Sequence, residues 1–145
     1  MRELYFAYGS NLSSRRLGQR VPGARALDTG ELDAYRLIFN KPSSDGSGKA
    51  NLVPAPGAKA WGVVWSLPAK AWRLLDGFEP GYTRQPCRVR GASGEWHSAQ
   101  VYLWLPPGPE QRPFASYLEH LREGAREHRL PAEFLEQLNR VETRP

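Results

Sequence analysis

The order of the predicted elements indicates an α+β fold. Strand patterns dominate the first two thirds of the chain, two short helix patterns interrupt them, and two further helix patterns close the sequence. Frequent glycine and proline residues separate these patterns, which is typical of short strands joined by turns. Because strands and helices do not alternate regularly, a doubly wound α/β sheet is not expected. The length of 145 residues fits a single domain over residues 1–145 with its own core.

Six segments carry the apolar patterns of β-strands. They span residues 4–8, 31–40, 50–53, 60–67, 82–90 and 95–105. Alternate residues from Trp61 to Leu67 share one face, as the period of two in a strand requires. The apolar members of the second strand are Leu32, Leu37, Ile38 and Phe39. The last two segments flank the turn Gly91-Ala92-Ser93-Gly94 and are expected to pair as a hairpin. The stretch 42–48, rich in Ser, Gly and Asp, is expected to be a loop.

The first helix is predicted over residues 13–20, directly after the first strand. Either Asn11 or Ser13 supplies a side chain that caps its N-terminus. The sequence Val21-Pro22-Gly23 then ends the helix, because proline and glycine do not continue it.

Three more helices are predicted from apolar spacing and terminal residues. The helix over 69–76 has Pro68 in its first turn and Gly77 as its C-terminal cap. Its expected apolar face consists of Ala71, Leu74, Leu75 and Phe78. The apolar stripe of the next helix consists of Phe114, Tyr117, Leu118, Leu121 and Ala125. Pro131 begins the last helix, whose inward residues are Phe134, Leu135, Leu138 and Val141.

Charge and cysteine content restrict the function classes. The net charge of +5 comes mainly from arginines that are dispersed along the chain. A solvated, arginine-rich surface explains this better than nucleic-acid binding, for which no motif is present, and no nucleic-acid partner is expected. The single cysteine, Cys87, cannot form an internal disulfide, which favours a reducing, cytoplasmic location. The scattered His97, His120 and His128 predict no metal site.

Membrane association is not expected either. No apolar stretch reaches the length of about 18 residues that a membrane-spanning helix needs. The N-terminus shows no basic leader followed by an apolar segment, so no signal peptide is predicted. The residue pattern leaves the oligomeric state open between a monomer and a homodimer.

The segment Leu4-Tyr5-Phe6-Ala7-Tyr8-Gly9-Ser10-Asn11-Leu12 is the most informative part of the chain. An apolar strand runs directly into Gly-Ser-Asn and then into a helix. Such a turn leaves several backbone N–H groups unpaired and pointing in one direction. These groups form a site for an anion, and a ligand carboxylate is the expected partner.

Glu79 is the candidate acid or base. It lies between Phe78 and Pro80, and Tyr82 follows closely. Burial among apolar neighbours raises the pKa of a carboxyl group, which a general base working near neutral pH requires. The alternative is a solvated glutamate that caps a turn, and the local sequence alone favours this alternative.

Several separated motifs occur together in a fixed order. They are Tyr8-Gly9-Ser10-Asn11-Leu12, Gly62-Val63-Val64-Trp65, Leu75-Asp76 with Glu79, Tyr117-Leu118, Gly124-Ala125-Arg126-Glu127, Leu130-Pro131 and Phe134-Leu135. This combination resembles the γ-glutamylcyclotransferase family, including its AIG2-like relatives, over nearly the whole chain. The resemblance implies a small mixed β-barrel with peripheral helices. It also implies an enzyme that cyclises γ-glutamyl compounds to 5-oxoproline without a cofactor.

The resemblance also implies roles for particular residues. The substrate-binding loop corresponds to Tyr5, Phe6, Ala7, Tyr8, Gly9 and Ser10, with Asn11 beside it. Its backbone N–H groups would hold the α-carboxylate of the γ-glutamyl group. Glu79 matches the catalytic glutamate, and Tyr117 matches a tyrosine that contacts substrate; a core aromatic on a helix stripe is the alternative for Tyr117. Tyr82 and Tyr102 lie where the family often has cavity tyrosines.

The expected reaction follows from the substrate atoms. The α-amine attacks the γ-carbonyl and closes a five-membered lactam, so the substrate carries its own nucleophile. The amine is largely an ammonium at neutral pH, since its pKa is about 7.7–8.0. Glu79 is expected to take the proton from this ammonium and to deliver it to the leaving nitrogen.

The group released from the γ-glutamyl moiety stays open at this stage. The short spacing from Glu79 to Arg84 is similar to the branch that acts on γ-glutamylamines, and deacylases are also relatives. A barrel that binds γ-glutamyl ligands without turnover is a further alternative. Arg84 and Arg88 are candidates for binding an anionic leaving group, although surface arginines in salt bridges or water explain them more simply.

Overall fold

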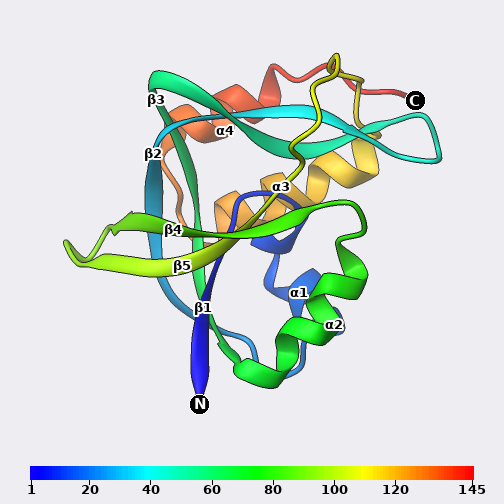
Figure 1. Ribbon diagram of the computed structural model, residues 1–145. Coiled ribbons are helices and arrows are strands. Elements are labelled where there is room, and N and C mark those ends of the chain that lie inside the picture. The colour runs from blue at the N-terminus through cyan, green and yellow to red at the C-terminus, as the bar shows by residue number, and fades with distance from the viewer.

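The computed structural model describes residues 1–145 as a closed barrel of five strands with helices around it (Figure 1). The strands are β1 (Arg2–Ala7), β2 (Arg25–Pro42), β3 (Gly48–Pro68), β4 (Thr83–Gly91) and β5 (Trp96–Leu103). The α-helices are α1 (Ser14–Arg20), α2 (Trp72–Phe78), α3 (Ala115–Glu127) and α4 (Ala132–Asn139). Two 3₁₀ turns, η1 (Ser10–Leu12) and η2 (Ala69–Ala71), precede α1 and α2. None of the helices combines the length and apolar character that a membrane crossing requires.

The barrel is mixed, as the resemblance to the family implies. Around it the strands run in the order β1-β3-β2-β4-β5. All neighbouring pairs are antiparallel except β1 and β5, which close the barrel in parallel through the single register pair Tyr5 and Gln100. The predicted α+β class is therefore confirmed, and the first strand becomes the seam of the barrel.

β2 and β3 are longer and more continuous than the sequence predicts. β2 begins at Arg25 instead of Glu31, and β3 joins the two predicted strands 50–53 and 60–67 into one. The residues between these segments contain proline and glycine, which break a strand pattern. In the structure they bulge opposite Ala34, whose φ of 65° marks the irregularity between Asp33 and Tyr35. The bulge bends both strands while their pairing continues.

Three glycines lie side by side across the barrel wall. Gly30 on β2 is the register partner of both Gly62 on β3 and Gly91 on β4. A Cβ on Gly30 would lie 2.6 Å from a Val89 methyl group, and one on Gly62 would lie 2.8 Å from the Phe6 ring. The missing side chains therefore let β2, β3 and β4 approach closely in this part of the barrel wall.

The closing helices α3 and α4 lie against the barrel, as Figure 1 shows. The aromatic side chains of β3 meet them: Trp61 packs on Phe134 and Trp65 meets the His128 ring edge-on. The buried members of the two predicted apolar stripes are Leu118, Leu121, Ala125, Phe134 and Leu138. α3 also presses on η1, because Gly124 leaves no room for a side chain beside Leu12. The helices thereby support the turn that follows β1.

The two short helices differ in detail from their predictions. Ser13 caps α1, because its side chain accepts a hydrogen bond from the Arg16 N–H at 3.2 Å. Asn11, the other proposed cap, does not cap this helix. The second helix begins as the 3₁₀ turn η2 and continues past the predicted cap Gly77 to Phe78.

The predicted apolar face of the second helix is wrong in part. Leu74 and Phe78 are about half exposed, whereas Trp72 is buried beside Ala71 and Leu75. A 3₁₀ turn winds more tightly than an α-helix, which rotates the face that meets the core.

Candidate functional site

A small cavity of about 30 Å³ lies where the end of β1, η1, β3, α2 and α3 meet. Its lining consists of Tyr5, Tyr8, Gly9, Ser10, Asn11, Ala50, Glu79, Tyr82, Tyr102 and Tyr117. Tyr5, Tyr8, Asn11 and Tyr102 are nearly inaccessible and form the cavity floor. Glu79, Tyr82 and Tyr117 keep partial exposure and form the cavity mouth. The volume corresponds to about one water molecule.

The loop after β1 contributes backbone donors to the cavity. The N–H groups of Tyr8 and Gly9 have no hydrogen-bond acceptor within the chain. Gly9 lies tightly between elements, since a Cβ there would be 3.1 Å from the Ala50 Cβ and 3.7 Å from the Tyr117 hydroxyl. The absence of a side chain therefore keeps these backbone donors next to the open space of the cavity.

Glu79 lies at the C-terminal cap of α2 and points into this site instead of into solvent. Its side chain is 16% exposed. Asn11 Nδ2 donates a hydrogen bond to Glu79 Oε1 at 3.2 Å, and Arg20 Nη1 lies 3.8 Å from the same oxygen. The local-sequence preference for a solvated, turn-capping glutamate is thus not what the fold produces.

Burial is the dominant influence on this carboxyl group. It raises the pKa of Glu79 from its ordinary 4.5 to about 7. The positive charges of Arg20, Arg16 and Lys41 oppose the rise in pKa, and so does the hydrogen bond from Asn11. The group is consequently poised to gain or lose a proton near neutral pH.

Three of the five cavity tyrosines donate their hydroxyl protons to acceptors within the protein. Tyr8 donates to the Tyr102 carbonyl oxygen at 2.6 Å, and Tyr82 donates to the Ala50 carbonyl oxygen at 2.7 Å. Tyr102 donates to Asp76 Oδ1 at 2.6 Å, which ties β5 to α2. These three side chains therefore brace the cavity through fixed hydrogen bonds.

The other two tyrosines accept hydrogen bonds but have no acceptor for their own protons. The Tyr117 hydroxyl accepts from the Ala50 N–H at 3.0 Å, and the Tyr5 hydroxyl accepts from Asn11 Nδ2 at 3.0 Å. Burial raises the pKa of Tyr117 to about 12 and raises that of Tyr5 further. Both phenols are neutral at physiological pH, so each has one O–H donor to offer a ligand.

The structure brings most of the predicted loop residues together around Glu79, but not all of them. The side chains of Phe6 and Ala7 do not line the cavity; both are buried in the barrel, where Phe6 packs by Gly62. Ala50 lines the cavity although the sequence does not single it out. Arg20, which lies 3.8 Å from Glu79, is a second residue near the site that the sequence does not single out. Its position at the end of the helix that follows the loop is the sequence feature that indicates this proximity.

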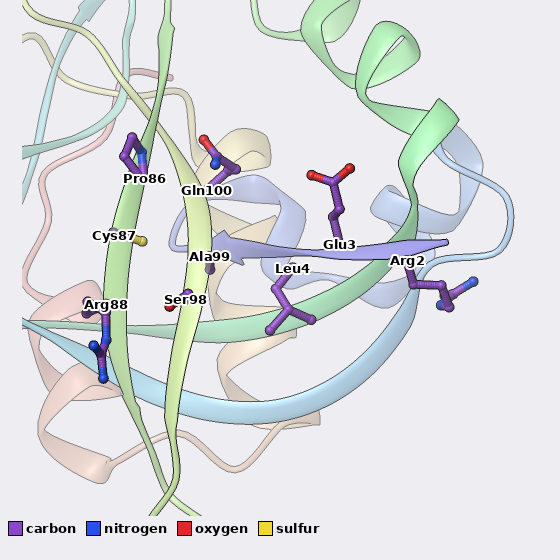
Figure 2. Close-up of a pocket in the computed structure, with 9 residues that line it drawn as sticks. All are labelled: Arg2, Glu3, Leu4, Pro86, Cys87, Arg88, Ser98, Ala99 and Gln100. Atoms are coloured by element: carbon purple, nitrogen blue, oxygen red, sulfur yellow. The ribbon is translucent and has the colours of Figure 1, made fainter.

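A larger hollow of about 460 Å³ lies elsewhere, outside the barrel by the seam of β1 with β4 and β5 (Figure 2). Arg2, Glu3 and Arg88 point in different directions there, so no set of polar groups converges on one point. The hollow follows from strand geometry, because β1 and β5 pair through a single register pair and then diverge.

The two arginines considered for an anionic leaving group lie away from the cavity lining. Arg84 stacks on Trp72 at 4.6 Å and lies 3.6 Å from Asp76 Oδ2. Arg88 lies over the Trp96 ring at 5.6 Å. The simpler interpretation, arginines engaged at the protein surface, describes both of them.

No three His, Cys, Asp or Glu side chains gather as a metal-binding cluster. His97 instead contacts Asp28 Oδ2 at 2.8 Å, and Ser93 Oγ donates to the same oxygen at 2.6 Å. Because the serine and the histidine both bind the aspartate and not each other, this group lacks the serine–histidine contact of a nucleophile and its base. It fastens the β4–β5 turn to β2.

Fold and site together define a class of protein: a small mixed barrel in which the loop after the first strand faces a buried glutamate. A family model described as "Gamma-glutamyl cyclotransferase, AIG2-like" matches residues 5–123. The γ-glutamylcyclotransferases of Bos taurus and Homo sapiens are each 31% identical over 153 aligned residues, which cover 96% of this chain and 78% of theirs. A solved structure named γ-glutamyl cyclotransferase superposes with a TM-score of 0.93 at 29% identity, covering 99% of this chain and 90% of that one. The chain belongs to the γ-glutamyl cyclotransferase, AIG2-like family, which confirms the resemblance seen in the sequence.

Proposed function

We propose that this chain converts γ-glutamyl compounds to 5-oxoproline and a free amine, with Glu79 as the group that moves the proton. The observation that carries this proposal is the buried Glu79 carboxyl, whose pKa is about 7 and which faces unpaired backbone donors after β1. The family membership supports the same activity.

The γ-glutamyl end of the substrate lies at the cavity floor. Its α-carboxylate accepts hydrogen bonds from the loop N–H groups of Tyr8 and Gly9, which lack other acceptors. The free O–H groups of Tyr5 and Tyr117 supply further donors. A carboxylate held by several donors gives the γ-glutamyl chain one orientation, which brings its amine near its own γ-carbonyl.

The first chemical step is proton removal followed by ring closure. Ionised Glu79 accepts a proton from the α-ammonium, and the freed amine attacks the γ-carbonyl carbon. A carbon–nitrogen bond forms, and the carbonyl oxygen takes up the negative charge. Hydroxyl or backbone donors of the site stabilise this oxyanion.

The second step is breakdown of the tetrahedral intermediate. Protonated Glu79 delivers its proton to the departing nitrogen, the bond from that nitrogen to carbon breaks, and the carbonyl of 5-oxoproline re-forms. The ring nitrogen, which holds two protons after the attack, gives one of them to the departing amine, which leaves as an ammonium ion. The carboxylate is then ionised again. A pKa near 7 suits both halves of this cycle, because neither protonation state is strongly disfavoured at neutral pH.

Substrate binding requires the cavity to widen. A volume of about 30 Å³ cannot hold a γ-glutamyl group. The side chains of the mouth are partly exposed, whereas those of the floor are tightly buried. We therefore expect the cavity to widen at its mouth while the floor stays in place.

The test is an assay of the purified chain with a panel of γ-glutamyl amino acids and amides, followed by chromatography for 5-oxoproline. Glu79→Gln keeps the size of the side chain and an oxygen that can accept from Asn11. We expect this variant to bind ligand and to lose turnover. Glu95→Gln, at an exposed position in the β4–β5 turn, is the control. Near wild-type release of 5-oxoproline by Glu79→Gln would refute the assignment.

A further inference from the structure

Two lysines lie opposite each other on the β2–β3 hairpin, next to the loop 43–47 that joins the two strands. Lys41 on β2 and Lys49 on β3 are direct register partners, so their side chains leave the same face of the hairpin. Like charges placed directly opposite each other across two strands destabilise the pair. An anion bound between the two ammonium groups would remove this repulsion.

Both ammonium groups lie over aromatic rings of the cavity mouth. Lys49 Nζ is 4.4 Å from the centre of the Tyr117 ring, and Lys41 Nζ is 5.7 Å from the centre of the Tyr82 ring. Lys41 Nζ also lies 5.6 Å from the Trp104 ring centre. Cation–π contacts of this kind hold the two charges beside the cavity instead of letting them extend into solvent.

The backbone beside Lys49 joins these two tyrosines. Tyr117 accepts a hydrogen bond from the Ala50 N–H, and Tyr82 donates to the Ala50 carbonyl oxygen. A single residue, Ala50, therefore fixes both rings relative to the lysine that precedes it. The lysine pair is in this way part of the framework of the mouth.

Neighbouring acids leave much of this positive charge uncompensated. The nearest carboxylate to Lys49 is that of Asp45 at 3.8 Å, on a side chain that is 44% exposed. Lys41 has no ion pair. Burial lowers the pKa of Lys49, and the charges of Lys41, Arg16 and Arg20 lower it further. An incoming anion would meet several cations, the loosely held Asp45 carboxylate, and Glu79, whose pKa of about 7 leaves it partly neutral.

We propose that Lys41 and Lys49 form an anion subsite that binds a carboxylate carried by the amine released from the γ-glutamyl group. This inference rests on the proposed function. Because the γ-glutamyl end occupies the buried floor, the released amine must extend past Glu79 towards the mouth, where the lysines lie. The favoured substrates are consequently γ-glutamyl α-amino acids or peptides, and γ-glutamylamines without a carboxylate are disfavoured.

A matched pair of substrates tests the subsite. γ-Glutamyl-alanine and γ-glutamyl-alaninamide differ only in that a carboxylate is replaced by a neutral amide. We expect the wild-type chain to show a kcat/KM about tenfold higher for the acid, the effect of one charge-assisted hydrogen bond. Lys41→Gln and Lys49→Gln should each reduce this ratio, and the double variant should bring it close to one. The readout is the ratio of acid to amide and not the absolute turnover, because Lys41 also opposes the rise in the pKa of Glu79 and its loss affects both substrates alike.

Lys59→Gln is the control, because Lys59 pairs with Glu31, whereas Lys41 and Lys49 lie over tyrosine rings of the cavity. A double variant that keeps the wild-type ratio, or a wild-type chain without preference for the acid, would overturn the subsite. Calorimetric binding of both ligands to Glu79→Gln separates this inference from the catalytic proposal. A lysine-dependent binding preference, together with no release of 5-oxoproline by the wild-type chain, would support the subsite and refute the catalysis. Binding of neither ligand would overturn the subsite.

Discussion

Asn11 Nδ2 lies 3.2 Å from Glu79 Oε1, in a hydrogen bond that joins side chains 68 positions apart. The same amide nitrogen donates to the Tyr5 hydroxyl, and Asn11 Oδ1 accepts from Arg20 Nη1 at 3.3 Å. One buried asparagine therefore connects the loop, the floor and the carboxylate. It sets the distance between the backbone donors that hold the substrate and the group that moves the proton.

Glu79→Gln should stabilise the fold more as the pH rises. The folded chain holds the pKa of Glu79 at about 7, above its ordinary 4.5, so the folded state binds more protons than the unfolded state between these values. The contribution of the glutamate to stability is therefore full below pH 4.5 and is lost as the pH rises through 7.

The neutral glutamine does not suffer this loss. The difference in unfolding free energy between Glu79→Gln and wild type should grow from near zero at pH 4.5 to on the order of 3 kcal/mol above pH 7. Urea denaturation at several pH values measures it. A difference that is independent of pH would mean that the carboxyl group titrates normally.

Arg20→Gln should move the acidic limb of the activity profile to higher pH. The wild-type kcat/KM should decline below an apparent pKa near 7, because Glu79 must be ionised to accept a proton. The nearby Arg20 guanidinium opposes the rise in the pKa of Glu79, so its removal raises that pKa. Activity at pH 6 should fall by a larger factor than activity at pH 9.

Two controls accompany the Arg20 variant. Arg20→Lys keeps the charge and should retain most of the wild-type profile. Arg15→Gln removes an exposed arginine that pairs with Glu123 instead of Glu79, and should leave the limb in place. A limb that stays at the same pH in Arg20→Gln would show that the guanidinium has no electrostatic effect on the carboxyl group.

Tyr117→Phe and Tyr102→Phe should have opposite consequences. Tyr117 has a hydroxyl proton free for a ligand, so its loss should lower kcat/KM by roughly tenfold or more. Tyr102 donates to Asp76, and its loss should cost about 1 kcal/mol of stability with a smaller effect on turnover. Steady-state kinetics and thermal unfolding of both variants measure the two effects. Equal losses of activity would contradict the distinction between donating and bracing tyrosines.

Gly124→Ala should be one of the more damaging glycine substitutions outside the cavity. A Cβ there collides with the side chain and backbone of Leu12, which leaves α3 no way to stay against η1. Overpacking of this kind costs about 1–3 kcal/mol, and it should also weaken substrate binding because η1 continues the loop.

Gly18→Ala provides the matched comparison. Nothing lies within 4 Å of a Cβ at Gly18 on α1, so alanine should stabilise that helix by about 0.5–1 kcal/mol. Urea unfolding of the two variants compares them directly. A stable, fully active Gly124→Ala would contradict the close packing of α3 on the turn.

The parts of this protein that could be read from the sequence rest on local chemistry. The apolar run before Gly9 predicts a strand followed by a donor-rich turn, because the backbone of that turn has no regular partners. The apolar neighbours of Glu79 are compatible with a raised pKa, but the local sequence alone favours a solvated glutamate, and it is burial in the fold that raises its pKa. The stripes of the last two helices predict their buried faces, since helical periodicity is independent of what covers it.

Other features depend on groups that are distant in sequence. The sequence predicts two strands where β3 is one bulged strand, because proline and glycine within 54–58 are typical of a break, and only pairing with β2 continues the strand across them. The exposed position of Phe78 follows from the 3₁₀ start of the second helix and from the Arg20 guanidinium lying 5.0 Å from its ring.

The sequence by itself determined the fold class and the family, because element patterns and the order of separated motifs are visible along the chain. It also predicted the two halves of the candidate site. Only the tertiary structure decided that Asn11 reaches Glu79, that Tyr5 and Tyr117 keep free hydroxyl protons, and that two lysines face each other at the mouth. Such relationships depend on burial and on distances across the barrel. No local pattern encodes them, since the atoms involved meet only when the chain is folded.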